Sequence, residues 1–478
     1  MTTPLSLPEE PAVYKSLVKA AVPVARLGQL LTVIRGVTYK KEMARSKPAD
    51  GFVALLRATN IQQSLGFDEL VYVPDSCVSE SQLLRAGDIL VVASSGSRTV
   101  VGKAAPLTHP WRGSFGAFCF ALRPNAGVDP TYIAAFLRSP GYRDRVSDLA
   151  AGTNINNLRA SHIEETPIPL PTTDRQRKIV AYLDEQLSRL DASVAALHRV
   201  QANLKRYRAS VLKAACEGRL VPTEAELARQ QGRDFETGAQ LLQRLLAERR
   251  ARSSRTSKYK EPIAASANEA HELPNGWTRA TVEQLTFLVT SGSRSWSAFY
   301  EDSGTLFIRA QDIKTDALNI DSVARVNVPA DAEGSRSSVD SGDILLTITG
   351  ANVTKSALVS ELSEPAFVSQ HVALLKLTFE GTAPFVFNWI VSPANGREIL
   401  ERWAYGAGKP GLSLEQVREL PVALPPLAEQ HRIVAEADRR LSLIRAAEAQ
   451  VAANLARSQR LRQSILQAAF AAPASAGQ

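Results

Sequence analysis

The chain has 478 residues, with 56 Lys and Arg against 48 Asp and Glu, and its formal net charge is +8. Hydrophobic residues make up 45% and charged residues 22%, which excludes a disordered chain. The basic surplus indicates either a polyanionic partner such as nucleic acid or a surface charge that aids solubility. Three scattered cysteines and no long apolar run exclude a disulfide framework and predict a cytoplasmic protein without membrane spans.

The first predicted domain covers residues 1–173. Its short apolar runs are rich in β-branched residues and are separated by Gly, Pro, Asn and Ser, as in the segment 87–97. This pattern indicates a β-rich globular domain with a few helices.

A long helix is predicted for residues 174–217. Thr172–Asp174 supply residues typical of a helix start, and neither Pro nor Gly occurs from Arg175 to Cys216. Apolar residues recur at spacings of three and four, which is typical of a helix that packs against a partner helix. The partner is either the matching helix at 425–472 or the helix's own globular domain.

A basic linker with a short amphipathic helix is predicted for residues 218–272. Its basic run, from Arg249 to Lys260, is either a solvated linker or a contact for phosphate. A second β-rich domain follows at 273–424, then the second long helix at 425–472 and a tail at 473–478.

The second half of the chain repeats the motifs of the first half in the same order, at a spacing of about 254 residues. The string Gly87–Leu90 recurs identically as Gly342–Leu345. The other pairs are Leu56–Ile61 with Ile308–Ile313, Pro167–Pro171 with Pro421–Pro425, Arg175–Leu187 with Glu429–Leu441, and Ser210–Ala215 with Ser464–Ala469.

No catalytic motif is found in the sequence. The Asn/Asp-Pro-Pro-aromatic string of adenine methyltransferases is absent, and the six histidines share no metal-ligand spacing. The segment Gly96–Ala104 approaches a phosphate-binding loop, but its spacing is wrong and Ala104 cannot bind magnesium. Asp88 and Asp343 precede strands, where aspartate usually caps a turn. The sequence therefore predicts a binding protein.

Taken together, the duplicated motifs resemble the specificity subunit of type I restriction–modification enzymes. The resemblance rests on the repeated GDIL strand, the polar loop after it, the P-x-P-L-P stop, the EQ-x-x-IV helix start and the SxLxxA helix end, in order from about Val24 to Ala471. It implies an α+β chain with an internal pseudo-two-fold repeat. Two β-rich target recognition domains would be separated by a pair of long antiparallel coiled-coil helices.

The resemblance also implies the function and the partners. Each recognition domain would read one half of a bipartite double-stranded DNA sequence. Two modification subunits would bind the chain and methylate adenine with S-adenosylmethionine, and restriction subunits would join with ATP and magnesium for cleavage. The chain itself would hold no cofactor and catalyse nothing.

Candidate DNA contacts are the polar residues that follow each GDIL strand or precede each P-x-P-L-P stop. Arg, Asn and Gln can pair with base edges, while Lys, Ser and Thr suit phosphates. Gln370 has no clear counterpart in the first copy, where Ser114–Gly116 lies nearby, and Gly102 and Gly350 are expected to serve backbone geometry. The candidates are Ser95, Ser97, Arg98, Thr99, Lys103, Asn154, Asn156, Asn157, Thr349, Asn352, Thr354, Lys355, Gln370 and Lys409.

Two other functions remain open at this level. One is a fused DNA-modifying enzyme, which needs a cofactor or metal motif that the sequence does not display. The other is a coiled-coil scaffold that links protein partners without binding DNA.

Overall fold

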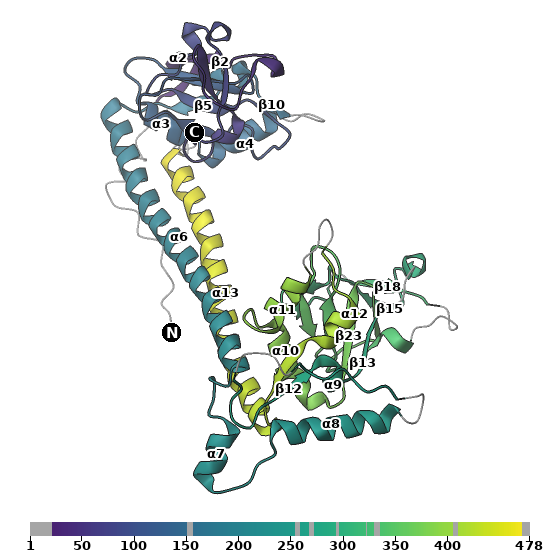
Figure 1. Ribbon diagram of the computed structural model, residues 1–478. Coiled ribbons are helices and arrows are strands. Elements are labelled where there is room, and N and C mark those ends of the chain that lie inside the picture. Colours follow the sequence, from purple (N-terminus) through teal and green to yellow (C-terminus); the bar gives the residue numbers. More distant parts are fainter. Residues whose placement is uncertain are drawn as a thin grey trace. The chain divides into compact units, whose positions relative to one another are not determined.

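A computed structural model describes residues 22–150, 156–253, 259–266, 272–292, 296–321, 323–328, 335–404 and 410–470. The chain divides into two compact units (Figure 1). Unit 1 comprises Met1–His198 and Ala452–Gln478, and unit 2 comprises Arg199–Val451. Each unit therefore contains a globular part and a portion of both long helices.

Unit 1 is built on a four-stranded antiparallel sheet of order β2-β9-β5-β7. A second, three-stranded sheet has the order β4-β3-β8, in which β3 and β8 are parallel. Two strand pairs, β1 with β11 and β6 with β10, complete the sheet structure. The strands are β1 (Val24–Arg26), β2 (Leu31–Arg35), β3 (Phe52–Leu56), β4 (Val71–Pro74), β5 (Ile89–Val92), β6 (Ser94–Ser95), β7 (Ala104–Pro106), β8 (Ser114–Phe115), β9 (Cys119–Pro124), β10 (Asn156–Asn157) and β11 (Pro167–Pro169); the helices of the globular part are α2 (Leu27–Leu30), α3 (Pro130–Phe136), α4 (Pro140–Leu149) and α5 (Ala160–Glu164).

Unit 2 repeats the strand order of unit 1. Its four-stranded sheet runs β13-β23-β20-β21, and its second sheet runs β14-β18-β15-β22-β19, with β15 and β22 parallel. The pair β12 with β24 corresponds to β1 with β11. The strands are β12 (Thr278–Thr281), β13 (Thr286–Ser291), β14 (Tyr300–Glu301), β15 (Thr305–Ile308), β16 (Ile313–Lys314), β17 (Ala317–Leu318), β18 (Ala324–Val326), β19 (Ser338–Val339), β20 (Ile344–Thr347), β21 (Ser356–Leu358), β22 (Ala366–Val368), β23 (Val372–Leu377) and β24 (Pro421–Leu424); the helices are α7 (Glu224–Gln231), α8 (Gly238–Ser253), α9 (Val282–Leu285), α10 (Ala383–Val391), α11 (Gly396–Trp403) and α12 (Leu414–Glu419).

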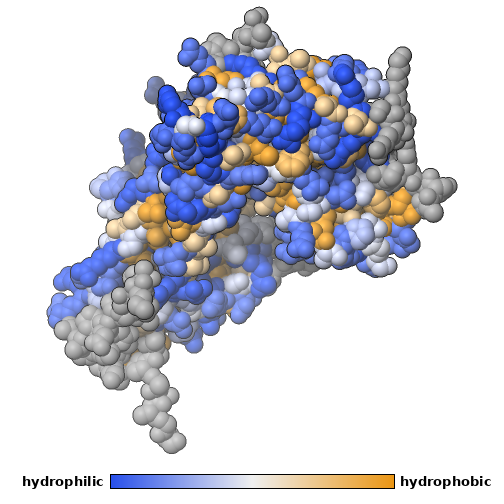
Figure 2. Space-filling model, turned by 90° about the horizontal axis from the view of Figure 1, so that it is seen from below, coloured by the Kyte–Doolittle hydropathy of each residue, from blue (hydrophilic) through white to orange (hydrophobic). Residues whose placement is uncertain are grey.

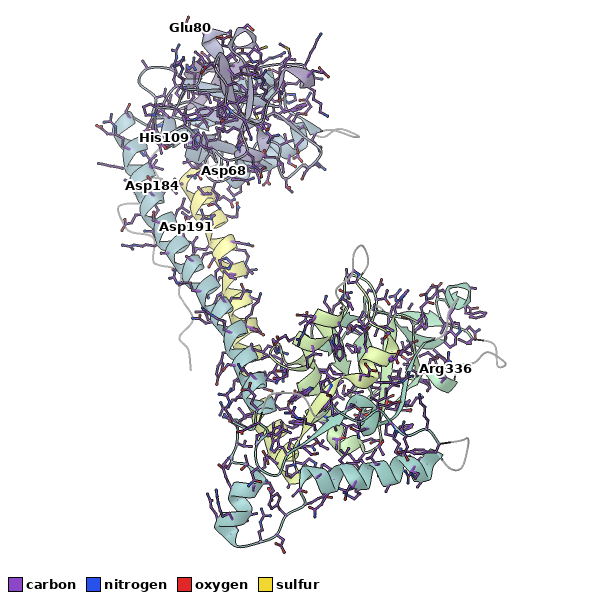
Figure 3. The ribbon with its side chains drawn as sticks, viewed as in Figure 1. Asp68, Glu80, His109, Asp184, Asp191 and Arg336 are labelled. Carbon is purple, nitrogen blue, oxygen red and sulfur yellow. The ribbon has the colours of Figure 1, made fainter. Side chains whose placement is uncertain are left out.

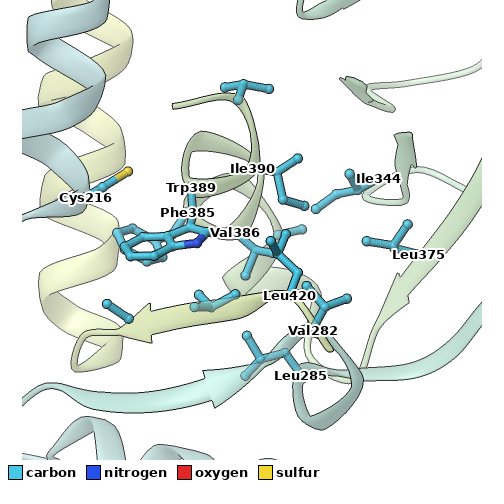
Figure 4. Packing of buried hydrophobic residues seen from close by; sticks show 14 of the residues in the cluster. Cys216, Val282, Leu285, Ile344, Leu375, Phe385, Val386, Trp389, Ile390 and Leu420 are labelled. Atoms are coloured by element: carbon cyan, nitrogen blue, oxygen red, sulfur yellow. The ribbon is translucent and has the colours of Figure 1, made fainter. Parts of the chain in front are cut away.

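The Ile-Leu pair of the repeated GDIL string begins a buried inner strand of each main sheet. In β5, Ile89 and Val91 face a core that includes helix α3, whereas Leu90 faces the second sheet. In β20, Ile344 faces α10 and Leu345 faces the second sheet, and Figure 4 shows Ile344 near Ile390 of α10. Because both faces are covered, a continuous apolar run is favoured over an alternating one.

The long helices are α6 (Thr173–Cys216) and α13 (Leu427–Phe470). In unit 1, Leu183 near the start of α6 shares a core with Leu466 near the end of α13. In unit 2, Leu212 near the end of α6 shares a core with Ile433 near the start of α13. The two helices are therefore antiparallel. Both cores also include residues of the sheets, so each helix packs against its partner helix and against the globular parts.

Polar contacts join the same helices. Asp184 and Asp191 lie along α6 (Figure 3), and Asp191 forms an ion pair with Arg462 of α13. Burial is the main cause that lowers the pKa of the nearby Arg138 guanidinium. Long-range attraction from the two aspartates opposes that effect.

The predicted linker between α6 and β12 packs onto the globular part of unit 2 through helix α8. Leu241 and Leu245 of α8 are buried in the core of unit 2. Arg249 donates from Nε to the Thr286 carbonyl at 2.9 Å, and Arg250 pairs with Glu261. These two arginines of the predicted basic run are thus bonded within the protein, whereas Arg255 and Lys258 of that run lie outside the described residues.

The described surface is mostly polar. Hydrophilic residues cover most of the face seen in Figure 2, with small hydrophobic areas between them. Within the described ranges, no helix is long and apolar enough to cross a membrane.

Candidate DNA-binding surface

The turn before each GDIL strand is held by its aspartate, as the sequence predicts. Asp88 accepts a hydrogen bond from the Arg85 N–H at 2.8 Å, and Asp343 accepts one from the Asp340 N–H at 2.7 Å. Burial raises the pKa of the Asp343 carboxyl, although its ion pair with Lys376 opposes that shift. The role of both aspartates is structural.

In unit 1, the polar loop after β5 meets the short strand β10. Ser95 pairs with Asn156 in the β6–β10 ladder. Asn156 donates from Nδ2 to the carbonyls of Ser95 and Gly96, at 3.4 and 3.3 Å. Its Oδ1 atom is buried and has no hydrogen-bond partner. The fold thus brings together two segments that the sequence identifies separately, while Asn154 lies outside the described residues.

Most of this loop is open to solvent. Ser97, Arg98, Thr99 and Asn157 are exposed. The Ser97 and Thr99 hydroxyls lie 2.9 Å apart, and Arg98 donates to the Ser147 carbonyl at 3.2 Å. These side chains are therefore accessible from solvent and remain candidates for contacts with DNA.

The lysine that closes each loop links it to the turn after the second sheet's central strand. Lys103 donates to Gln62 Oε1 at 3.0 Å. In unit 2, Lys355 donates to Asn352 Oδ1 at 2.7 Å, and Asn352 in turn donates to the Ala310 carbonyl at 3.1 Å. The predicted contacts of both units therefore lie beside the repeated segments Leu56–Ile61 and Ile308–Ile313.

Thr354 is one of two buried candidates among those that the structure describes, since it is only 5% exposed, as is Asn156. Its φ of 70° places it in the left-handed region, where the equivalent Gly102 has a φ of 75°. Both residues donate their N–H to the preceding strand, Thr354 to Thr347 and Gly102 to Val92. The burial argues against a direct contact between Thr354 and DNA. Gly102 and Gly350 do serve backbone geometry, the latter with a φ of 92°.

A cavity of about 410 Å³ in unit 2 contains several of the candidates. Thr349, Asn352 and Gln370 line it, while Lys409 lies outside the described residues. Sequence reasoning missed the rest of the lining, although the repeated Arg-Ala pair at Arg57 and Arg309 gave a signal for part of it. The missed residues are Trp296, Tyr300, Phe307, Arg309, Ala310, Gln311, Ser369 and His371, whereas Ala351 belongs to the predicted polar loop.

Arg309 is held firmly at the edge of this cavity. It donates from Nε to Asp312 Oδ2 at 3.0 Å and from Nη2 to Asp312 Oδ1 at 3.1 Å. This hydrogen bonding is the main cause that raises the pKa of the Arg309 guanidinium. A two-point contact of this kind fixes the plane of the guanidinium group.

The turn after β8 in unit 1 and the turn after β22 in unit 2 make equivalent backbone hydrogen bonds. Gly116 donates to the Leu56 carbonyl at 2.9 Å, and Ser369 donates to the Ile308 carbonyl at 2.9 Å. The Phe118 carbonyl accepts a hydrogen bond at 2.8 Å from Ala93, the residue after β5. The His371 carbonyl accepts one at 2.9 Å from Ile348, the residue after β20. Gln370 therefore does have a counterpart, Ala117, and the Ser114–Gly116 segment is offset from it.

Comparisons with known proteins agree with this geometry. Residues 22–202 match the family described as the type I restriction modification DNA specificity domain. The chain is 30% identical over 452 residues to the type I restriction enzyme StySPI specificity subunit of Salmonella potsdam, covering 93% of this chain and 88% of that one. This chain belongs to the type I restriction enzyme specificity subunits.

A second specificity subunit and one solved structure extend the comparison. The EcoKI specificity subunit of Escherichia coli K12 is 29% identical over 457 residues, or 94% of this chain and 88% of that one. A chain from a structure on complex assembly and conformational transition of the type I R-M system has a TM-score of 0.62 at 17% identity, and the match covers 95% and 99% of the two chains. That structure supports the fold.

Membership of the specificity subunits decides the kind of site. A specificity subunit is the non-catalytic, DNA-recognising part of its enzyme, so the polar loops are candidates for recognition. Within the described part of the chain, no group of three or more His, Cys, Asp or Glu side chains is placed to hold a metal ion.

Proposed function

We propose that this specificity subunit reads a bipartite DNA sequence, one half with each unit. The observation that carries the proposal is the repetition of one recognition fold. Both units have the same strand order in the main sheet, and both have an exposed or half-exposed polar loop after the GDIL strand. The loops differ in sequence, as two unlike half-sites require, and the net charge of +8 suits a polyanion.

We further propose that the paired helices fix the unread spacer between the half-sites. Helices α6 and α13 contribute residues to both units. A helix of 44 residues spans about 66 Å at 1.5 Å per residue. A spacer of fixed length along a duplex needs a connection of this stiffness.

The catalytic chemistry would come from partner subunits. We propose that two modification subunits dock on this chain and methylate adenine with S-adenosylmethionine. Restriction subunits would then supply ATP- and magnesium-dependent cleavage. A cytoplasmic location, where the DNA is, belongs to the same proposal.

A scaffold without DNA contact is the competing function, and the exposed helix residues Tyr207 and Leu443 favour protein partners. Tyr207 is 48% exposed and Leu443 is 62% exposed. These residues suit docking of the modification subunits equally well, so their exposure does not distinguish the two functions. The two functions differ in whether the chain binds DNA.

The test is a map of adenine methylation in cells that express this chain together with its modification subunit. We expect a split sequence with one methylated adenine on each strand, absent when this chain is omitted. A continuous methylated word, or the same methylation without this chain, would contradict the proposal. An unmethylated genome despite a purified, stable complex would favour the scaffold.

A further inference from the structure

We infer that the turns Gly116–Phe118 and Ser369–His371 read bases, and that they do so with opposite chemistry. In unit 1, Phe118 packs against the methyl group of a thymine. In unit 2, Gln370 hydrogen-bonds the edge of an adenine. This inference rests on the proposed DNA recognition and assigns residues and base chemistry to it.

The two turns occupy the same place in the recognition fold. The residue after β8 and the residue after β22 each donate to the end of the second sheet's parallel strand. Two residues later, the carbonyls of Phe118 and His371 each accept a hydrogen bond from the residue just before the polar loop, Ala93 in unit 1 and Ile348 in unit 2. Each turn is therefore joined by its backbone to the loop already proposed to face DNA.

The side chains at this shared place are unlike. Phe118 is 68% exposed, which is the largest exposure among the exposed large hydrophobic residues of the described chain. Ala117 beside it is exposed as well. In unit 2 the same positions hold Gln370 and His371, whose Nε2 atoms lie 3.2 Å apart. Two units that read unlike half-sites must differ where bases are read, and these turns differ in polarity.

Isolated exposed hydrophobic residues are ordinary on protein surfaces, so the position of Phe118 is what matters. Its carbonyl accepts from both Ala93 and Ser94, at 2.8 and 3.2 Å, which places it at the root of the polar loop. Aromatic and methyl-bearing side chains contact the thymine methyl in the major groove. Polar loop residues around it can hold the phosphates.

A buried polar atom without a hydrogen-bond partner lies in the unit 2 turn, and another lies beside the unit 1 polar loop. Ser369 is 6% exposed, lines the unit 2 cavity, and its hydroxyl has no hydrogen-bond partner. Asn156, which is 5% exposed beside the unit 1 loop, has an unpartnered Oδ1. Buried polar atoms are usually satisfied, so both atoms point to a ligand that completes them.

The unit 2 cavity suits a polar base edge. Gln370 retains its Oε1 and one amide hydrogen, the pair that matches N6 and N7 of adenine. Asn352 and Arg309 on the cavity wall are tied to protein groups, so they shape the cavity and leave Gln370 to pair with the base.

The test uses the complex of this chain with its modification subunits and a duplex that carries the mapped target. In one series each thymine of the target is replaced in turn by uracil, which removes only the methyl group. We expect one replacement, in one half-site, to weaken binding about fivefold, as the lower end of a single base contact implies. The variant Phe118→Ala should bind thymine and uracil duplexes equally at that position.

The second series replaces each adenine by 7-deazaadenine, which removes the N7 acceptor. One replacement in the other half-site should weaken binding about tenfold. Gln370→Ala should abolish that difference and leave the uracil effect unchanged. The matched control is Val24→Ala, which shortens the side chain of a residue that is 63% exposed on β1 of unit 1; it should keep both differences.

The outcomes are separable. If the wild-type complex does not prefer its target over competitor DNA, the proposed function itself fails. If it does prefer the target, but no thymine effect depends on Phe118 and no adenine effect depends on Gln370, the inference is wrong and the proposed function stands. A first half-site without thymine would also overturn the assignment of Phe118.

Discussion

The carboxylate of Asp316 accepts a hydrogen bond from Arg208 of α6 at 3.3 Å. Its other oxygen accepts from Arg397 of α11 at 2.5 Å. The Asp316 side chain is only 5% exposed. One buried carboxylate thus joins the long helix to the globular part of unit 2.

Asp316→Ala should lower the free energy of unfolding of unit 2 by about 3 kcal/mol, because it leaves two arginines without their partner in a partly buried site. Chemical denaturation, followed by tryptophan fluorescence, measures the change. Asp321→Ala, at an exposed position, is the control and should change little. Equal stability of the two variants would show that the ion pair contributes nothing to this junction.

Gly102→Ala should destabilise unit 1 strongly. A Cβ there would lie 2.4 Å from Val146 Cγ1, and the φ of 75° is itself costly for alanine. Gly51→Ala is the matched control, because Gly51 has a φ of 72° and no atom within 4 Å of the added Cβ. The control should cost about 1 kcal/mol from the backbone alone, and Gly102→Ala clearly more. Similar melting temperatures for the two variants would exclude the steric contact.

Only one of the three cysteines should react with a thiol reagent in the folded protein. Burial raises the pKa values of Cys119 and Cys216 to about 12, so the thiolate that reacts is almost absent at pH 8. Cys77 is half-buried. Counting the labelled thiols with and without denaturant checks this; more than one fast thiol in the native protein would be inconsistent with the packing.

The stabilising effect of Glu436 should depend on pH. Hydrogen bonds from Arg439, the larger contribution, and from Arg440 lower the pKa of the Glu436 carboxyl to about 2 from the usual 4.5. A lowered carboxyl pKa stabilises the fold above the unfolded value, and the effect is lost as the pH falls through the folded value. Glu436→Gln should therefore lower the melting temperature at pH 7, and the difference should shrink between pH 4.5 and 2. A constant difference across that range would assign the effect to another cause.

Arg98→Ala should weaken DNA binding by the complex, because the exposed guanidinium lies in the polar loop. If it binds a phosphate, the slope of log affinity against log salt concentration should become shallower by about one. If it binds a guanine, the preference for that base at one position of the target should be lost. Arg26→Ala, exposed on β1, serves as the control. Unchanged affinity and preference would remove Arg98 from the site.

Sequence patterns were sufficient for the repeated core and the long helices. The GDIL strings are buried on both faces, so their composition alone indicates strands. The apolar pattern of α6 predicts a helix because no Pro or Gly interrupts it between Arg175 and Cys216. The packing of α8 was not predictable, because Leu241 and Leu245 find their partners in a sheet formed far along the chain.

The candidate site was predictable only in part. The polar loops stand out because they follow a repeated string. The place of Phe118 depends on a backbone bond to Ala93, which no local pattern reveals. Thr354 was predicted from its place in the second polar loop, but it is buried and its backbone lies in the left-handed region.

In the proposed function, one chain holds two recognition units at a fixed separation. The most direct measurement is the affinity of the complex for duplexes in which either half-site is scrambled or the spacer is lengthened by one base pair. Each of the three changes should weaken binding by roughly tenfold or more, since each removes the base contacts of at least one unit. Full affinity for the lengthened spacer, or for a duplex with either half-site scrambled, would contradict the proposed function.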